Sequence, residues 1–469
     1  MNRKNELLKN SIIIGIGNIF TKAISFLLVP LFTLWLTTKQ YGDYDLLYSY
    51  VSLIVPAITL QLEQANLRYT LEKKADGPRY FHVSAIVVII NSIIIGVIFG
   101  LICHFEYHSA FAFCSIAYAL QIYMTEYLRG CNELKQYSIA NIFCGICTIV
   151  FSFVLVKICN FGVSGLLTAF GLSYLLTAAV IYIQKRLYQG IRKDLSNDNM
   201  TTLKLLLAYS LPLLPNAISW WITNVSDRTI IRVFIGSHYN GLYAVSCKIP
   251  SLITVFYGIF NLAWQQSAIL SAKDDLEERK KFYGSIFRQL SVFLFSGAFV
   301  VISATPILYK LFLKPEYMDG INVVPILIWA TVMLNLAQFL GGILLGFKDT
   351  KTNGSTTVLA AIVNLAIDLL LIQKIGLYAA AGSTLVSYFL MMILRMKKLK
   401  SLFDMKKVIS TVTIGSLAVI GVSALMITIQ NFLFQWAILL LMIVLFFFMN
   451  RKTIRSILNR AKRRSVSCG

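Results

Sequence analysis

The sequence of 469 residues contains little charge and particularly few acidic residues. Only 14% of its residues are Asp, Glu, Lys or Arg, whereas soluble domains average about 25%. Lys and Arg number 43 against 21 Asp and Glu, and cysteine occurs only eight times, at scattered positions. Apolar residues make up 57% of the chain. This composition excludes a soluble globular enzyme, a disordered tail protein and a disulfide scaffold, and it indicates an integral membrane protein.

Motifs that would support catalysis are also missing. The chain has no glycine-rich phosphate loop, so we expect no ATP hydrolysis by this polypeptide. Cys144 and Cys147 form a CxxC pair within one apolar segment, but no two further ligands accompany them. No catalytic set of side chains is found. We therefore expect a protein that is not an enzyme, with no cofactor and no metal site.

Long apolar runs dominate the chain. Roughly 20 mostly apolar residues are needed to cross the hydrocarbon of a bilayer. Fourteen such segments are predicted, at 11–36, 45–64, 81–103, 111–128, 139–159, 162–183, 205–235, 242–270, 286–312, 323–346, 356–372, 377–396, 408–429 and 432–450. The predicted fold class is an all-α polytopic membrane protein with fourteen transmembrane helices.

The basic residues indicate the orientation of these spans. Of the 43 Lys and Arg residues, 34 fall in loops and tails on the side of the N-terminus, five fall on the opposite side and four lie within spans. Basic loops face the cytoplasm, so we expect a multi-pass membrane protein with both termini cytoplasmic. The basic tail is expected to contact anionic lipid and not nucleic acid.

Weak internal similarity predicts two related halves. A shift of 199 residues aligns Gly42 with Gly241 and Tyr44 with Tyr243, and a later pair of spans aligns in the same order. We predict two pseudo-symmetric six-helix bundles followed by a C-terminal helix pair. The expected parts are an N-terminal bundle (1–184), a cytoplasmic linker (185–204), a C-terminal bundle (205–398), an extra helix pair (399–450) and a basic cytoplasmic tail (451–469).

Ionisable residues within spans are costly in a membrane and by default mark functional sites. Seven of the eight deepest lie on the first hairpin of each half, namely Lys22, Asp45, Glu63, Asp227, Arg228, Arg232 and Lys248, and the eighth is Asp368. Asn18 and Asn224 extend the same helical stripes. This distribution predicts a wet cavity between the two bundles, and seven of the nine prolines, which bend helices, also fall within spans.

A structural role for these charges stays open. Arg228 could pair with Asp227 or Asp45 and lock the bundle, and Lys248 and Asp45 could extend to the outer interface. In the functional alternative, the planar guanidiniums of Arg228 and Arg232 suit bidentate contacts with phosphate.

Several short segments resemble a known family. They are residues 9–17 near the start of the chain, Tyr41-Gly42-Asp43-Tyr44, Pro212-Leu-Leu-Pro215, Ser226-Asp227-Arg228 and Gly241-Leu-Tyr243. Together with the fourteen spans, they resemble Wzx-type flippases of O-antigen and polysaccharide repeat units, which belong to the multidrug/oligosaccharidyl-lipid/polysaccharide exporter (MOP) superfamily.

The resemblance implies a cargo and assigns roles to residues. The cargo would be an oligosaccharide repeat unit on undecaprenyl diphosphate, moved from the inner to the outer leaflet for O-antigen, lipopolysaccharide or capsule synthesis. It makes Lys22, Arg228, Arg232, Lys248, Asn18 and Asn224 candidates for headgroup binding. Asp45, Glu63, Asp227 and Asp368 become candidates for charge pairing or for coupling to H+ or Na+. A polysaccharide polymerase and chain-length machinery are the implied protein partners.

Two other functions compete with this interpretation. A drug/cation antiporter of the related MATE type would share the two-bundle fold, but the extra helix pair and the basic residues in the spans disfavour it. A membrane-embedded polysaccharide polymerase would need a large outward loop or a catalytic carboxylate pair, and the predicted outward loops are short.

Overall fold

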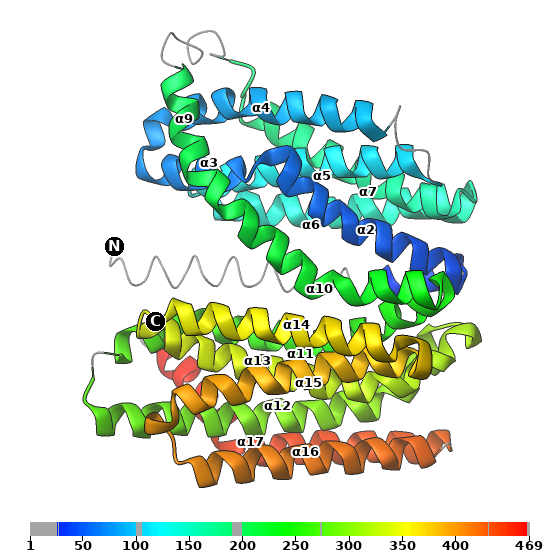
Figure 1. The fold of residues 1–469 in the computed structure, drawn as a ribbon, viewed down its shortest axis with the longest axis vertical. Coiled ribbons are helices and arrows are strands. Elements are labelled where there is room, and N and C mark those ends of the chain that lie inside the picture. The colour runs from blue at the N-terminus through cyan, green and yellow to red at the C-terminus, as the bar shows by residue number, and fades with distance from the viewer. Residues whose placement is uncertain are drawn as a thin grey trace. The chain divides into compact units, whose positions relative to one another are not determined.

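The computed structural model describes residues 26, 28–99, 106–189, 199–272, 274–429 and 431–466, and the regular structure in these ranges is helical throughout. The chain forms two compact units, Met1–Thr229 and Ile230–Gly469 (Figure 1). Within the described ranges, nine helices are long and apolar enough to cross a membrane, and a bent helix pair adds a tenth. The predicted all-α polytopic fold is therefore confirmed, and fourteen spans remain consistent with it.

The helices of the first unit reproduce the predicted spans from the second onward. They are α2 (Thr38–Thr59), α3 (Leu62–Glu72), α4 (Gly77–Val97), α5 (His108–Gly130), α6 (Leu134–Ser152), α7 (Gly162–Gln184), α9 (Asn199–Ser210) and α10 (Leu214–Phe234). The predicted first span, 11–36, falls largely outside the described residues.

Helix α5 packs against α7, α2 and α3. A Cβ atom at Gly171 of α7 would lie 2.6 Å from the ring of Phe113 on α5, so this glycine permits the close approach of the two helices.

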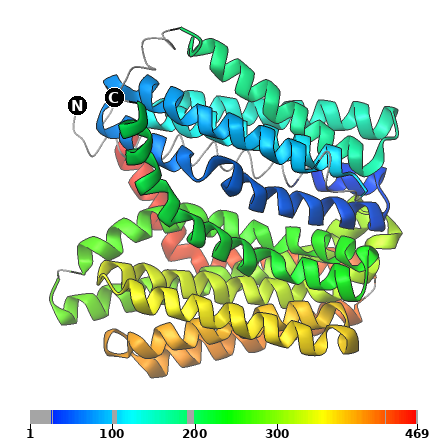
Figure 2. The same cartoon turned by 45° about the horizontal axis from the view of Figure 1, so that its top comes forward.

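The helices of the second unit are α11 (Ser237–Ser271), α12 (Leu276–Phe312), α13 (Val324–Gly346), α14 (Thr350–Ile375), α15 (Leu377–Lys398), α16 (Met405–Thr428) and α17 (Phe432–Val466). α13 contacts α11, α12 and α15, while α14 and α15 lie side by side in both views (Figures 1 and 2). The predicted extra helix pair corresponds to α16 and α17, and both helices pack against α12.

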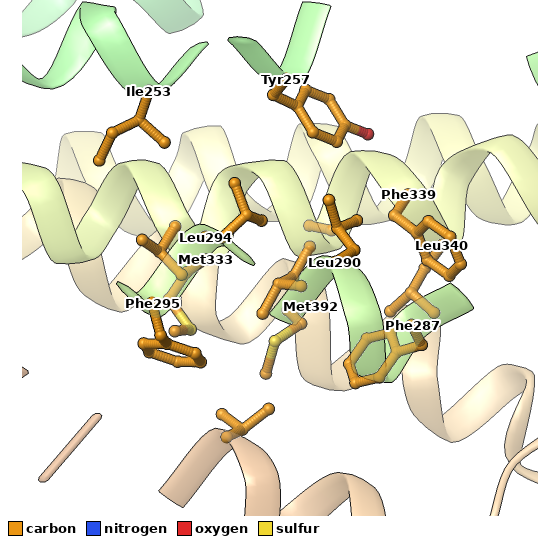
Figure 3. Packing of buried hydrophobic residues seen from close by; sticks show 14 of the residues in the cluster. Ile253, Tyr257, Phe287, Leu290, Leu294, Phe295, Met333, Phe339, Leu340 and Met392 are labelled. Carbon is orange, nitrogen blue, oxygen red and sulfur yellow. The ribbon is translucent and has the colours of Figure 1, made fainter. Parts of the chain in front are cut away.

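Aromatic and aliphatic side chains fill the space between α11, α12, α13 and α15 (Figure 3). Trp264 of α11 stacks on Phe339 of α13 with ring centroids 4.0 Å apart, and its indole nitrogen donates a hydrogen bond to the Phe339 carbonyl. A Cβ atom at Gly342 would lie 2.8 Å from the indole nitrogen, so glycine makes room for the tryptophan. In a bilayer such close packing replaces the hydrophobic driving force of soluble cores.

The division between the two compact units falls between Thr229 and Ile230, inside α10. The physical reason is that the N-terminal part of α10 is bonded to α2 of the first unit, through the contacts described next.

Candidate functional site

Two of the predicted site residues meet inside the first unit. Asp45 of α2 is 5% exposed, and its Oδ2 atom lies 2.8 Å from Nε of Arg228 on α10. The Arg228 Nη1 atom also donates to Oγ of Ser49, one turn along α2, at 3.3 Å. Asp45 is therefore a carboxylate partner of Arg228. The Arg228 side chain nevertheless keeps a relative exposure of 20%, so the ion pair is not completely buried.

Neighbouring contacts fix the two helices around this ion pair. The indole nitrogen of Trp221 donates to the Ser49 carbonyl oxygen at 2.8 Å, and the hydroxyls of Tyr50 and Thr229 lie 3.0 Å apart. The rings of Tyr50 and Trp221 have centroids 5.3 Å apart. Positions 221 and 228 are seven residues apart and so share one face of α10. The guanidinium is thus held in place by a rigid frame.

The other predicted cavity residues are distributed as follows. Asn18 and Lys22 lie outside the described residues, as does the side chain of Asn224. Asp227 is half-buried beside Arg228 on α10, and Arg232 is exposed in the last turn of that helix. Lys248 is half-buried on α11 of the second unit.

Glu63 lies at a break in a membrane span. Helices α2 and α3 meet at an angle of 57°, and Leu60 and Gln61 between them adopt left-handed backbone conformations with φ of 49° and 58°. The Asn91 side chain donates to the Ile58 carbonyl at 3.0 Å, which satisfies a backbone group near the break. Glu63 is buried in the first turn of α3. Broken helices with buried ionisable residues are typical of transporter sites.

Asp368 belongs to a buried polar cluster between α14 and α15. Its Oδ1 atom accepts a hydrogen bond from the Ser383 hydroxyl at 2.6 Å. The amide nitrogen of Asn364, one turn earlier on α14, donates to Ser383 at 3.0 Å and lies 3.4 Å from the Thr384 hydroxyl. A carboxylate, an amide and two hydroxyls therefore gather in one place. Such oxygen donors can bind a small hard cation.

Sequence reasoning missed a cavity within the first unit. This cavity, of about 280 Å³, is lined by polar and aromatic side chains that include Tyr48, Tyr118, Gln121, Glu126, Asn141 and Tyr174. Glu126 is 6% exposed and pairs with Arg129, with Oε2 2.7 Å from Nη1. The sequence signal for this cavity was the presence of Gln121 and Glu126 within the predicted span 111–128.

Arg395 was also missed, because its position at the end of a span had placed it among the cytoplasmic loop residues. Its side chain is 4% exposed and joins three helices. Nη1 donates to the Ala337 carbonyl of α13 at 2.7 Å. Nη2 and Nε donate to the Asn353 carbonyl and the hydroxyls of Thr356 and Thr357 on α14, at 2.9 to 3.1 Å. Arg395 forms no ion pair among the described residues.

Comparisons with known proteins agree with this architecture. Over 436 residues the chain is 22% identical to a probable low-salt glycan biosynthesis flippase, Agl15, from Haloferax volcanii, covering 89% of each protein. Its fold is similar to that of the lipid II flippase MurJ in an inward closed conformation, with a TM-score of 0.67, 14% identity and coverage of 94% of this chain and 100% of MurJ. An inward-facing MATE-family transporter of the MOP superfamily matches with a TM-score of 0.63 and 15% identity, over 86% of this chain and 95% of that one.

A family model also matches. The model described as "Polysaccharide biosynthesis protein" covers residues 7–265, more than half of the chain. The fold is therefore shared with these transporters, and the chain belongs to the polysaccharide biosynthesis protein family, in agreement with the family resemblance of the sequence.

Proposed function

We propose that this protein is a flippase that moves a lipid-linked oligosaccharide from the inner to the outer leaflet of a membrane. The observation that carries the proposal is the Asp45–Arg228 ion pair, a fixed and partly accessible guanidinium within a membrane-embedded unit. Family membership and the glycan flippase relative support it. A cargo on undecaprenyl diphosphate would present phosphates, which arginine binds through two parallel hydrogen bonds.

The ion pair suggests how a charged headgroup is admitted. The carboxylate of Asp45 pairs with the guanidinium of Arg228. A diphosphate would replace one anion by another at the same donors, so neither step leaves the arginine without a counter-charge. This exchange matters because an uncompensated charge within a membrane protein is costly. Lys22, Arg232 and Lys248 are the other proposed headgroup contacts, and Asn18 and Asn224 would bind sugar or phosphate oxygens.

The proposed setting is a bacterial inner membrane, with both termini in the cytoplasm and the cargo destined for O-antigen or capsule. A polysaccharide polymerase and chain-length machinery would act on the units after translocation. The charge bias of the loops supports this orientation.

A deletion strain tests the proposed function. Loss of a flippase traps lipid-linked repeat units in the inner leaflet, whereas loss of a polymerase leaves single units on the outer face. The wild-type gene is expected to restore surface polysaccharide, and Arg228→Ala or Lys22→Ala is expected not to do so at equal membrane abundance. Full complementation by both variants would refute their role. Accumulation of single units outside would refute the flippase itself.

We further propose that Na+ binds at the Asp368 cluster and couples transport to an ion gradient, with H+ as the alternative ion and Glu63 as the alternative site. The Asp368 carboxylate and the nearby hydroxyl oxygens of Ser383 and Thr384 support this choice. In proteoliposomes, an imposed Na+ gradient should accelerate flipping by the wild type and leave Asp368→Asn unaffected. Asp349→Asn, at the start of the same helix, is the matched control and should keep the Na+ response. Acceleration by a pH gradient alone would assign the coupling to H+.

A further inference from the structure

A second polar site lies at one end of the C-terminal unit, and none of the residues assigned to transport belongs to it. It is an open cavity of about 1010 Å³ between the start of α12 and the start of α16, which we call the α12–α16 cavity. Its lining comes from 277–288 and 401–411. The distribution of basic residues places this end at the cytoplasmic surface of the membrane.

The α12–α16 cavity carries an excess of positive charge. Five basic and two acidic side chains line it. Both acids are paired with a lysine of their own helix, Glu277 with Lys280 at 2.8 Å and Asp404 with Lys407 at 3.1 Å. The remaining bases, Lys281, Arg288 and Lys406, are exposed and form no ion pair among the described residues. Three cations that converge from two helices provide a site for an anion.

The floor of the cavity is apolar and its walls carry hydroxyls. The rings of Phe287 and Phe403 pack edge to face with centroids 5.6 Å apart, and both are buried together with Val408. Ser401 and Ser410 line the walls. Hydroxyl donors beside the cations suit phosphate oxygens, while the apolar floor suits a ligand that is only partly polar.

The surface of α16 extends this apolar character away from the charges. Ile414 and Leu417 follow Ser410 at four and seven residues, so all three share one face of the helix. Ile414 is 65% exposed and Leu417 is 63% exposed. A molecule whose anionic end lies in the cavity would therefore find an apolar path along the helix. A free phosphate would make no use of this path, but the acyl chains of a lipid would.

We propose that the α12–α16 cavity binds the phosphate headgroup of an anionic phospholipid, whose acyl chains lie along the Ile414 and Leu417 face. Basic pockets between helices at the cytoplasmic surface are a recognised means of binding such headgroups. The lipid would stabilise α16 against α12 from the side of the bilayer. This site is independent of the proposed transport function, because it shares no residue with it.

Native mass spectrometry of the purified full-length protein in detergent, titrated with phosphatidylglycerol, tests the proposal. The double variant Arg288→Gln/Lys406→Gln removes one cation from each helix. Each base near an anionic headgroup contributes roughly fivefold to affinity, so the variant should bind the first lipid about 30-fold more weakly. The matched control, Lys351→Gln/Lys397→Gln, removes two exposed cations that do not line the cavity and should bind like the wild type.

Further titrations distinguish the source of the phosphate. Phosphatidylcholine, glycerophosphoglycerol and inorganic phosphate should all bind much more weakly than phosphatidylglycerol, because they lack either the net charge or the chains. The charge-conserving variant Arg288→Lys/Lys406→Arg should retain binding, which separates lost charge from lost folding. Equal binding by the two charge-removing variants, or by phosphatidylcholine, would overturn the proposal. Tight binding of inorganic phosphate would assign the cavity to a soluble anion, and tighter binding of undecaprenyl phosphate would assign it to the cargo lipid.

Discussion

Arg228 and Arg395 lie in different units and show two ways of accommodating a guanidinium in a membrane protein. Arg228 pairs with a carboxylate, Asp45, and keeps a partly exposed face. Arg395 is buried, and its described hydrogen bonds run to carbonyl and hydroxyl oxygens of α13 and α14. Gly341 leaves space for it, since a Cβ atom there would lie 2.7 Å from Nη1.

The contacts of Arg395 indicate a structural role, whereas a transport role is what we propose for Arg228. The Arg395 donors are used to join three helices, so an arriving ligand would have to break the packing to reach them. Arg228 instead pairs with a carboxylate and keeps a side-chain exposure of 20%, as the proposed exchange with a diphosphate requires. Burial alone therefore does not mark a transport residue. The proposed transport role of Arg228 rests on the identity of its partner and on its remaining exposure.

The largest expected effect on stability comes from removing the Arg395 side chain, which joins three helices. Arg395→Ala leaves two carbonyls and two hydroxyls without their donor and opens a cavity, so we expect a loss of stability of about 4 kcal/mol. Thermal unfolding in detergent, monitored by size-exclusion chromatography, measures it. Lys397→Ala, exposed on the same helix, should change stability by less than about 0.5 kcal/mol. Normal stability of Arg395→Ala would mean that the comparison between the arginines is wrong.

A double-mutant cycle on the Asp45–Arg228 pair should give an intermediate effect on stability. Asp45→Asn and Arg228→Gln each leave one charge without its partner, and we expect a coupling energy of about 2 kcal/mol between them. The double variant should recover part of the stability but none of the transport, because the guanidinium is gone. Recovery of transport by the neutral pair would show that Arg228 is structural, as Arg395 is.

The smallest effect concerns a carboxylate outside the spans. Asp349 caps α14, and hydrogen bonds from the backbone and side chain of Thr352 hold the pKa of its carboxyl below the usual 3.8. The charged form therefore stabilises the fold above pH 3.8, and this contribution is lost as the pH falls through the lowered pKa. The small difference in melting temperature between the wild type and Asp349→Asn should vanish in acid. A difference that persists at low pH would show that the charge is not its cause.

The positions of the helices could be predicted from the sequence, but the partners of the charged residues could not. Apolar runs predict the helices because each span must satisfy its own backbone. The same reasoning placed Arg395 in a loop, because hydropathy does not report a neighbouring helix that offers a carbonyl oxygen. It left open whether Arg228 pairs with Asp45, since this contact depends on the packing of α2 against α10. The break between α2 and α3 also escaped prediction, although Pro56 lies shortly before it.

The break between α2 and α3 also bears on how the chain is assembled during synthesis. The Ile58 carbonyl receives its hydrogen bond from Asn91, a residue of α4 that the ribosome produces later. A carbonyl without a partner in hydrocarbon costs several kcal/mol. The bent conformation of this span is therefore stabilised only after α4 has entered the membrane. We therefore expect the α2–α3 segment to insert before α4 and to reach its final bent conformation once Asn91 of α4 is in place.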